Sequence, residues 1–452
     1  MRRTTYRPVG RVNSVSGNGR TERVVVTAAL VLVALIAVRL ATMGSMLGIG
    51  LAVGVSLFIV LLSALGTERT GTLTIAAAFV TAPVYKGISP TPESPVTPTD
   101  LLFVVGFGLL LPTMLKRRVE LPFIYLIGLL GMFVTGIIGS LVSDQTYASL
   151  FALTLWLVVI GGLPSAMALW GPTRRTIDLL LWSYVGGHMV SVLVAFKDGP
   201  GEQGRYGGLA THYNYFAQAG LLSVAILLYL FHRVTTWPQR WVVIGAGLVS
   251  AYSIQMSGSR AAIAVMAVLI LMVPIVERSA ILGFLLAMGG ALAFIALPLL
   301  VSITGEDSAL GRLAGGGGSG AQYSNQAREL GRDAGIARFF DHPFTGSGVV
   351  DLFEIHNNYL EAAVALGVFG LVAFLLVLFT FARPLFGNGP DRRLCYAVWA
   401  YIGFGATTPG LYDRGIWAPV SLSILAAISW WNTERRAAGT LRVTPAPATV
   451  PS

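Results

Sequence analysis

Long apolar segments, separated by short polar stretches, follow one another along almost the whole chain. A helix of about 20 apolar residues is long enough to cross a lipid bilayer. The pattern therefore predicts an all-α polytopic membrane protein with about 12–14 transmembrane helices. Fourteen segments fit this length, at roughly 24–41, 45–65, 72–86, 100–115, 121–143, 149–170, 176–196, 213–232, 240–257, 261–276, 279–302, 357–382, 394–408 and 416–431.

These segments divide the chain into five parts. We expect a basic N-terminal tail, a first group of eleven helices, one long external loop, a second group of three helices and a C-terminal tail. In order, the parts are 1–23, 24–302, 303–355, 356–431 and 432–452.

Composition agrees with the membrane class. The chain is 54% hydrophobic and 12% charged, whereas ordinary globular proteins are about 25% charged. The single cysteine, Cys395, excludes a disulfide within the chain and makes a metal site built on cysteine improbable. No other metal-ligating motif stands out, and we expect neither a metal nor a cofactor.

The net charge of +10 points to membrane orientation and not to nucleic acid, because of where the basic residues lie. They cluster in alternate loops, at the N-terminal tail, 116–118, 174–175, 392–393 and 435–436. Cytoplasmic loops of membrane proteins are enriched in arginine and lysine. Both termini are therefore predicted to be cytoplasmic.

Two arginines at predicted outer ends of segments depart from that bias. Arg205 stands in "GEQGRYGGLATHYNYFAQ" and Arg260 in "MSGSRAAIAV". Each could be an arginine that only extends toward the membrane surface. Their surroundings of glycine and serine, with few acidic residues, favour a clamp for a phosphate or diphosphate, which the arginine fork fits well.

The external loop contains a predicted helix. Residues 323, 327, 330, 334 and 337 are tyrosine, alanine or leucine at spacings of three and four, which is typical of one face of an amphipathic helix. Arg328 and Arg332 are four residues apart and should project from one side of it. A structured basic segment of this length favours a lid over a polar cavity.

His356 opens the stretch "HNNYLEAAVALGVFGLVAFLL". In one interpretation it caps a helix together with Asn357 and Asn358. In the other it is a general base, since a neutral imidazole accepts a proton from a hydroxyl. Of the other histidines, His212 and His342 are predicted to be external and remain candidates.

Several of these features occur together in one family. The features are Arg-x-x-Gly with a later asparagine (Arg205, Gly208, Asn214), Ser-Gly-Ser-Arg (257–260), Arg328, "DHPFTGSGVVDLF" and "HNNYLEAAVALGVFG". In this order, over about residues 200–375, they resemble the O-antigen ligase and O-antigen polymerase family of bacterial membrane glycosyltransferases. His212 stands in "THYN", where the family usually has a proline before the asparagine.

The resemblance implies a C-class glycosyltransferase fold and a donor glycan carried on polyprenyl diphosphate of the undecaprenyl type. It also implies metal-independent transfer to a hydroxyl of a glycan, lipid or protein, at the outer face of the bacterial cytoplasmic membrane. We expect Arg205 and Arg260 to hold the diphosphate and His356 to act as the base in an inverting attack. Further substrate-binding residues are expected to be Arg328, Arg332, Asn357 and His212.

Two other classes of function fit the sequence less well. A transporter or a flippase for lipid-linked glycans would carry charged residues near the middle of its spans and often internal repeats, and neither is evident here. A structural scaffold would leave the external arginines and His356 without a role. The sequence does not separate a polymerase from a ligase, since the two differ only in the acceptor.

Overall fold

The computed structural model describes residues 46–84, 97–201, 204–315, 318–350, 352 and 355–442. These ranges are helical and contain no strand, so the predicted all-α membrane fold is confirmed. The predicted N-terminal tail and first segment (24–41) lie outside the described residues.

The chain forms two compact units, residues 1–70 and 71–452. The described part of the first unit belongs to helix α2 (Met46–Thr81), which is interrupted by a non-helical residue at Gly66. All further description concerns the second unit, which contains every residue singled out above as a candidate for function.

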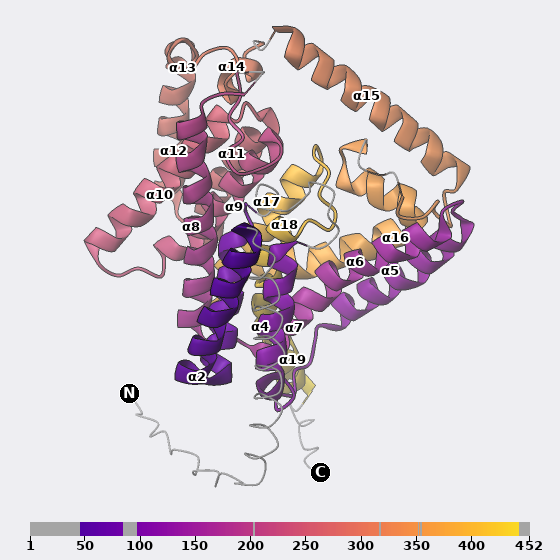
Figure 1. Cartoon of the computed structure of the whole chain (residues 1–452). Coiled ribbons are helices and arrows are strands. Elements are labelled where there is room, and N and C mark those ends of the chain that lie inside the picture. The colour runs from indigo at the N-terminus through magenta and orange to yellow at the C-terminus, as the bar shows by residue number, and fades with distance from the viewer. Residues whose placement is uncertain are drawn as a thin grey trace, which may run out of the picture. The chain divides into compact units, whose positions relative to one another are not determined.

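Helices of very different length make up this second unit (Figure 1). They are α4 (Pro98–Met114), α5 (Phe123–Val142), α6 (Thr146–Leu157), η1 (Val158–Gly162), α7 (Leu163–Trp170), α8 (Arg174–Asp198), α9 (Tyr213–Phe231), α10 (Trp237–Met256), α11 (Arg260–Glu277), α12 (Ala280–Ile295), α13 (Leu297–Thr304), α14 (Ala309–Leu313), α15 (Gly318–Asp341), α16 (Asn358–Ala382), η3 (Arg383–Phe386), η4 (Arg392–Cys395), α17 (Tyr396–Gly405), α18 (Arg414–Ser421) and α19 (Ser423–Arg442).

Six helical stretches in the described part of the chain are long and apolar enough to cross a membrane, and the bent pair α12–α13, at 61°, would make seven. The six are Phe123–Val142, Thr146–Trp170, Arg174–Asp198, Tyr213–Phe231, Arg260–Glu277 and Asn358–Phe386. The larger number of segments expected from hydropathy, and the domain boundaries drawn from them, remain predictions.

The helices form two groups. One contains α8 to α13, and the other contains α5, α6 and α16, which lean away from the first group (Figure 1). In the second group α5 packs along α16, and Trp156 of α6 meets Phe374 of α16 with ring centroids 5.9 Å apart. Aromatic pairs at this distance stabilise a packed core beyond the area that they bury.

Helix α16 is interrupted at Gly367, which has a φ of 69°. A side chain there would be strained, because L-residues rarely adopt this conformation. It would also place a Cβ 2.5 Å from the backbone oxygen of Phe344. The loop before α16 instead packs into the interruption, and Val368 donates its backbone N–H to the oxygen of Pro343 at 2.8 Å. The glycine of the "GVFG" motif thus lets the loop that leads to His356 lie against α16.

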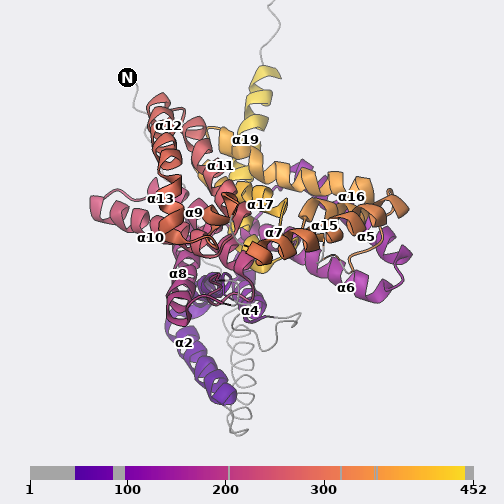
Figure 2. The same ribbon diagram turned by 90° about the horizontal axis from the view of Figure 1, so that it is seen from above.

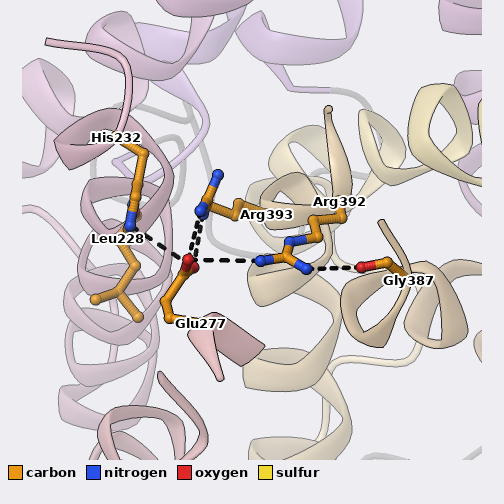
Figure 3. A network of polar contacts seen from close by, with 6 residues as sticks. All are labelled: Leu228, His232, Glu277, Gly387, Arg392 and Arg393. Atoms are coloured by element: carbon orange, nitrogen blue, oxygen red, sulfur yellow. Dashed lines mark hydrogen bonds and ion pairs between the residues drawn. The ribbon is translucent and has the colours of Figure 1, made fainter. Parts of the chain in front are cut away.

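At the opposite end of α11 from Arg260, one carboxylate holds three helix ends together (Figure 3). Glu277 accepts from the Nε of Arg393 at 2.7 Å and pairs with Arg392 at 3.4 Å, both from η4. The Nε2 of His232, at the end of α9, lies 3.6 Å from the same carboxylate. Charge-assisted contacts of this kind fix the ends of α9 and α11 relative to η4. The spacing between the first residues of α9 and α11, at the opposite ends of these helices, is therefore also fixed.

The first residues of α9 and α11 lie beneath α15. Helix α15 begins near α14 and crosses over α16, so that it links the two groups of helices (Figures 1 and 2). Its Arg338 donates to the hydroxyl of Ser347 at 2.9 Å, in the loop that precedes α16. The predicted helix in the 303–355 segment is therefore present, and it lies across the region that holds the candidate residues.

Candidate functional site

Arg205 lies in the loop between α8 and α9 and is 3% exposed. Its Nε donates to the backbone oxygen of Ser257 at 2.6 Å, and its Nη2 donates to Oδ1 of Asn214 at 3.2 Å. The guanidinium carbon also lies 4.6 Å from the ring centroid of Tyr213, a cation–π distance. These contacts fix the guanidinium in one orientation. None of these three partners is a carboxylate, so they do not neutralise its positive charge.

Arg260 is the first residue of α11, directly after the Ser257–Ser259 turn that receives Arg205. In this turn Ser259 donates its backbone N–H to the hydroxyl of Ser257 at 3.2 Å, and Gly258 adopts a φ of 68°. The guanidinium of Arg260 donates to the side-chain oxygen of Asn325 on α15. The motif Ser-Gly-Ser-Arg therefore joins the α8–α9 loop, the start of α11 and the helix that covers them.

Two more arginines complete a basic pocket. Arg312, from α14, is 6% exposed, and its Nε is buried with no hydrogen-bond partner among the described residues. Arg328, from α15, is half-buried at the same place. The pocket is lined by Arg205, Asn214, Gly258, Ser259, Arg260, Ala261, Arg312 and Arg328. Hereafter we call it the arginine pocket.

The four arginines disfavour one another's charge. Burial, followed by the positive charges of Arg312, Arg328 and Arg260, lowers the pKa of Arg205 to about 9, against an opposing effect of Tyr213. Burial, followed by repulsion from Arg260 and Arg312, also lowers the pKa of Arg328.

Arg312 is subject to the same forces. Burial and the charge of Arg260 lower its pKa, whereas the carboxylate of Asp307 raises it. One carboxylate does not compensate four guanidinium groups. Buried charges are normally paired, so the arginine pocket contains positive charge that these neighbours leave uncompensated.

Inorganic pyrophosphate is expected to stabilise the purified protein by filling this pocket. An anion that binds only the folded state adds about 2.7 kcal/mol at a concentration 100 times its dissociation constant. The unfolding temperature should therefore rise by several degrees. It should rise equally in an Arg332→Ala control and little in Arg205→Ala, and thermal unfolding in detergent would measure the difference. Equal shifts in all three proteins would show that pyrophosphate acts elsewhere.

His356 lies directly before the first turn of α16 and is half-buried. Its φ of 56° is left-handed, a conformation that is uncommon outside glycine and costs roughly 1–3 kcal/mol. The helix cap is Asn357, whose Oδ1 accepts from the backbone N–H groups of Tyr359 and Leu360 at 3.0 and 3.1 Å. Asn357 therefore supplies the helix cap that one interpretation of the sequence assigned to His356, Asn357 and Asn358 together.

The side chain of Asn357 also fixes the surroundings of His356. Its Nδ2 donates to the backbone oxygen of Ala406 at 3.1 Å, in the loop that leads from α17 to α18. Residues on both sides of His356 contact α15, since a Cβ at Gly335 would lie 3.1–3.2 Å from the side chains of Leu360 and Ile355. His356 is therefore held at a junction between α15, α16 and the 406–413 loop.

Helix α15 connects this junction to the arginine pocket. Arg328 and Gly335 lie on the face of α15 that turns inward, seven residues apart, which corresponds to about 10 Å along a helix. Arg328 lines the arginine pocket, and Gly335 packs against Ile355 and Leu360, which lie on either side of His356 in the sequence.

The remaining predicted residues lie outside the pocket. The side chain of Arg332 is 58% exposed and pairs with Asp333 at 3.0 Å. His212 is exposed and caps α9, because its Nδ1 accepts from the backbone N–H of Asn214 at 3.1 Å. Neither arrangement brings these side chains to the lining of the arginine pocket.

Sequence reasoning did not single out Arg312 or Asn325. Arg312 is in a glycine-rich stretch with no periodicity that would assign it a direction. Asn325 belongs to α15, but only the fold shows that it faces Arg260. The described residues also contain no group of three or more histidine, cysteine, aspartate or glutamate side chains placed to hold a metal ion.

A comparison with known families matches part of this chain. Residues 245–375 match the O-antigen ligase family. This segment is O-antigen ligase-like. It contains Arg260, Arg312, Arg328 and His356, whereas Arg205 lies before it. The resemblance to the O-antigen ligase family is thereby confirmed for residues 245–375. A search of curated proteins gave no significant match.

Proposed function

We propose that this chain transfers a glycan from a polyprenyl diphosphate carrier to a hydroxyl acceptor. The observation that carries the proposal is the arginine pocket, four guanidinium groups converging with one nearby carboxylate, beside a segment similar to O-antigen ligases. Among the substrates of such a family, a lipid-linked diphosphate matches a pocket that needs a multiply charged anion.

The arginine pocket acts on the leaving group. As the bond between the sugar and the diphosphate breaks, negative charge grows on the bridging oxygen. Fixed guanidinium groups stabilise that charge better than water does, because they are already oriented before the reaction begins. Arg205 is oriented by Ser257 and Asn214, and the Nε–H of Arg312 is available to donate.

His356 acts on the acceptor. Its neutral imidazole accepts the proton of the acceptor hydroxyl while the oxygen attacks the anomeric carbon. The new carbon–oxygen bond forms as the bond to the diphosphate breaks, and the diphosphate leaves with the electron pair. A single displacement of this kind inverts the anomeric configuration. General-base catalysis typically contributes about 100- to 10,000-fold in rate.

Helix α15 serves as the cover of the reaction site. It brings Arg328 to the diphosphate, and it is tied to α11 through Asn325 and to the loop before α16 through Arg338. Exclusion of water strengthens electrostatic interactions beneath such a cover and protects the donor from hydrolysis. We propose that this side faces outward from the cytoplasmic membrane, with both termini inside.

Reporter fusions test this orientation. A reporter inserted at an exposed position of α15 should report an external location, and fusions after residues 117 and 392 should report the cytoplasm. This follows because α15 and the two basic loops belong to opposite ends of the proposed spans. A cytoplasmic signal from the α15 insertion would place His356 and the arginine pocket in the wrong compartment and would refute the proposal.

The acceptor decides between a polymerase and a ligase. A polymerase would use a second lipid-linked glycan, and a ligase would use a terminal lipid, protein or wall polymer. Deletion of the gene should therefore leave either single repeat units or complete chains on the lipid carrier. Mass spectrometry of the accumulated lipid-linked glycan distinguishes the two.

A further inference from the structure

A buried acidic side chain lies in the first turns of α16, close to His356. Glu361 is 3% exposed, and its Oε1 has no hydrogen-bond partner among the described residues. Its backbone N–H donates to the oxygen of Asn357 at 2.8 Å, and its carboxyl group interacts with the backbone N–H of Asn357. That N–H belongs to the peptide bond between His356 and Asn357. The carboxyl group therefore lies beside the backbone that carries the proposed base.

No cation of the described residues pairs with this carboxyl group. Three tyrosines interact electrostatically with Glu361, one each from α9, α17 and the 406–413 loop, namely Tyr215, Tyr401 and Tyr412. A buried carboxyl group without a cation is more stable with its proton than without it, because an isolated charge is very costly in an apolar environment. These surroundings therefore favour Glu361 as the neutral acid.

Two further buried oxygens lack partners in this region. They are Oδ1 of Asn358, three residues before Glu361 on α16, and Oε1 of Gln218 on α9, and neither has a hydrogen-bond partner among the described residues. Tyr215 links the two helices, since it lies one turn before Gln218 and interacts electrostatically with both Glu361 and Asp413. Buried polar atoms of this kind in native proteins are usually hydrogen-bonded to ordered water.

A small cavity next to these groups has room for about one water molecule. Tyr215, Gln218 and Asp413 contribute to its lining, and part of it is open to solvent. A hydroxyl, an amide oxygen and a carboxylate supply the two to four polar partners that a buried water needs. Polar groups therefore follow one another from the first turns of α16 to a cavity that opens to solvent.

The proposed reaction produces a proton that must be removed. Each transfer leaves His356 with the proton of the acceptor hydroxyl, and the imidazole must lose it before the next transfer. Helix α15 packs against the residues on both sides of His356 in the sequence, Ile355 and the nearby Leu360. A route through the protein, away from α15, would remove the proton without admitting bulk water to the donor.

We propose that Glu361 relays this proton from His356 to solvent. The imidazolium gives its proton to one oxygen of Glu361, directly or through an ordered water. A carboxylic acid can accept a proton at one oxygen while it releases its own proton from the other, so Glu361 ends the cycle unchanged. The released proton passes to the water in the cavity and then to solvent, and His356 is neutral again. This assignment rests on the proposed function, in which His356 is the base.

Rapid-quench kinetics of glycan transfer separate a relay from a structural role. Glu361→Gln keeps the size of the side chain and an oxygen that accepts hydrogen bonds, but an amide does not relay a proton readily. The first turnover should proceed at the wild-type rate, because His356 starts neutral. Later turnovers should slow by about 100-fold, the lower end for loss of a proton-transfer group.

Two comparisons complete this experiment. Imidazole in the buffer should restore the later turnovers, because a small base can carry the proton in place of Glu361. Glu434→Gln, at an exposed glutamate of α19 that pairs with Arg383, should behave as the wild type does. The relay is excluded if Glu361→Gln slows the first turnover as much as the later ones, if imidazole restores nothing, or if no turnover is slowed.

Infrared spectroscopy tests the relay without the reaction. At neutral pH the full-length wild type in detergent should show a carboxylic acid band that is absent from Glu361→Gln and present in Glu434→Gln. The band should shift promptly in D2O, because a relay exchanges its proton with solvent. A missing band, or one that does not shift, would overturn the relay whatever the activity. A wild type that has the exchanging band but transfers no glycan would instead count against the proposed function.

Discussion

Replacing Arg205 with alanine should reduce glycan transfer by about 100- to 1,000-fold, the usual effect of removing one fixed group that stabilises charge in the transition state. Arg260→Ala should have an effect of similar size. Both guanidinium groups line the arginine pocket, and the charge that they stabilise grows as the diphosphate leaves. The loss should therefore appear mainly in kcat, measured with purified protein and a lipid-linked donor.

The controls for these variants come from the same chain. Arg332→Ala removes an arginine that pairs with Asp333 at the surface of α15, and it should keep nearly full activity. Arg205→Lys should recover little, because an ammonium group cannot donate to Ser257 and Asn214 in the fork geometry that Arg205 uses. Wild-type activity in both Arg205→Ala and Arg260→Ala would exclude the arginine pocket as the site of catalysis.

Replacing His356 with glutamine should reduce the rate by about 100- to 10,000-fold, the range for loss of a general base, while donor binding persists. The wild-type rate should also fall as the pH is lowered, because a protonated imidazole cannot accept the acceptor's proton. In His356→Gln this acid limb should be absent. A pH–rate series on both proteins measures the two effects together.

Two further variants separate a chemical role of His356 from a purely structural one. Asn357 is the residue that caps α16, so Asn357→Ala should cost about 1 kcal/mol of stability and leave a pH profile like that of the wild type. His356→Gly relieves the left-handed backbone and should stabilise the protein but remain inactive. A His356→Gln enzyme that turns over near the wild-type rate would show that the imidazole has no chemical part in transfer.

Much of the fold could be predicted from hydropathy, because burial of apolar length in a bilayer leaves a strong signal. Hydropathy did not predict which face of α15 is buried. The alanine and leucine residues expected to be buried are exposed, Leu330 by 66%. The face that turns inward instead carries Arg328, Gly331, Gly335 and Arg338. Periodicity assigns burial to apolar side chains, whereas here Gly335 permits the close approach of Ile355 and Leu360, and Arg338 donates to Ser347.

The same reason limits what could be predicted of the site. The motifs around Arg205, Arg260 and Arg328 indicated an anion clamp, and the structure brings these residues together. From its spacing, Arg332 was expected to project from the same side of α15 as Arg328. Its side chain instead faces solvent and pairs with Asp333. Arg312 was not singled out, since a residue in a glycine-rich loop has no direction until the surrounding helices fix it.

The proposed function is tested most directly by glycan transfer in vitro, with release of the lipid carrier. Purified protein would be incubated in EDTA with a polyprenyl diphosphate-linked glycan and a hydroxyl acceptor, and both products would be followed by mass spectrometry. We expect glycosylated acceptor and polyprenyl diphosphate to appear in equal amounts, with an inverted anomeric linkage, and neither to appear with Arg205→Ala. Movement of intact donor across a vesicle membrane without cleavage, or a strict requirement for a divalent cation, would contradict the mechanism.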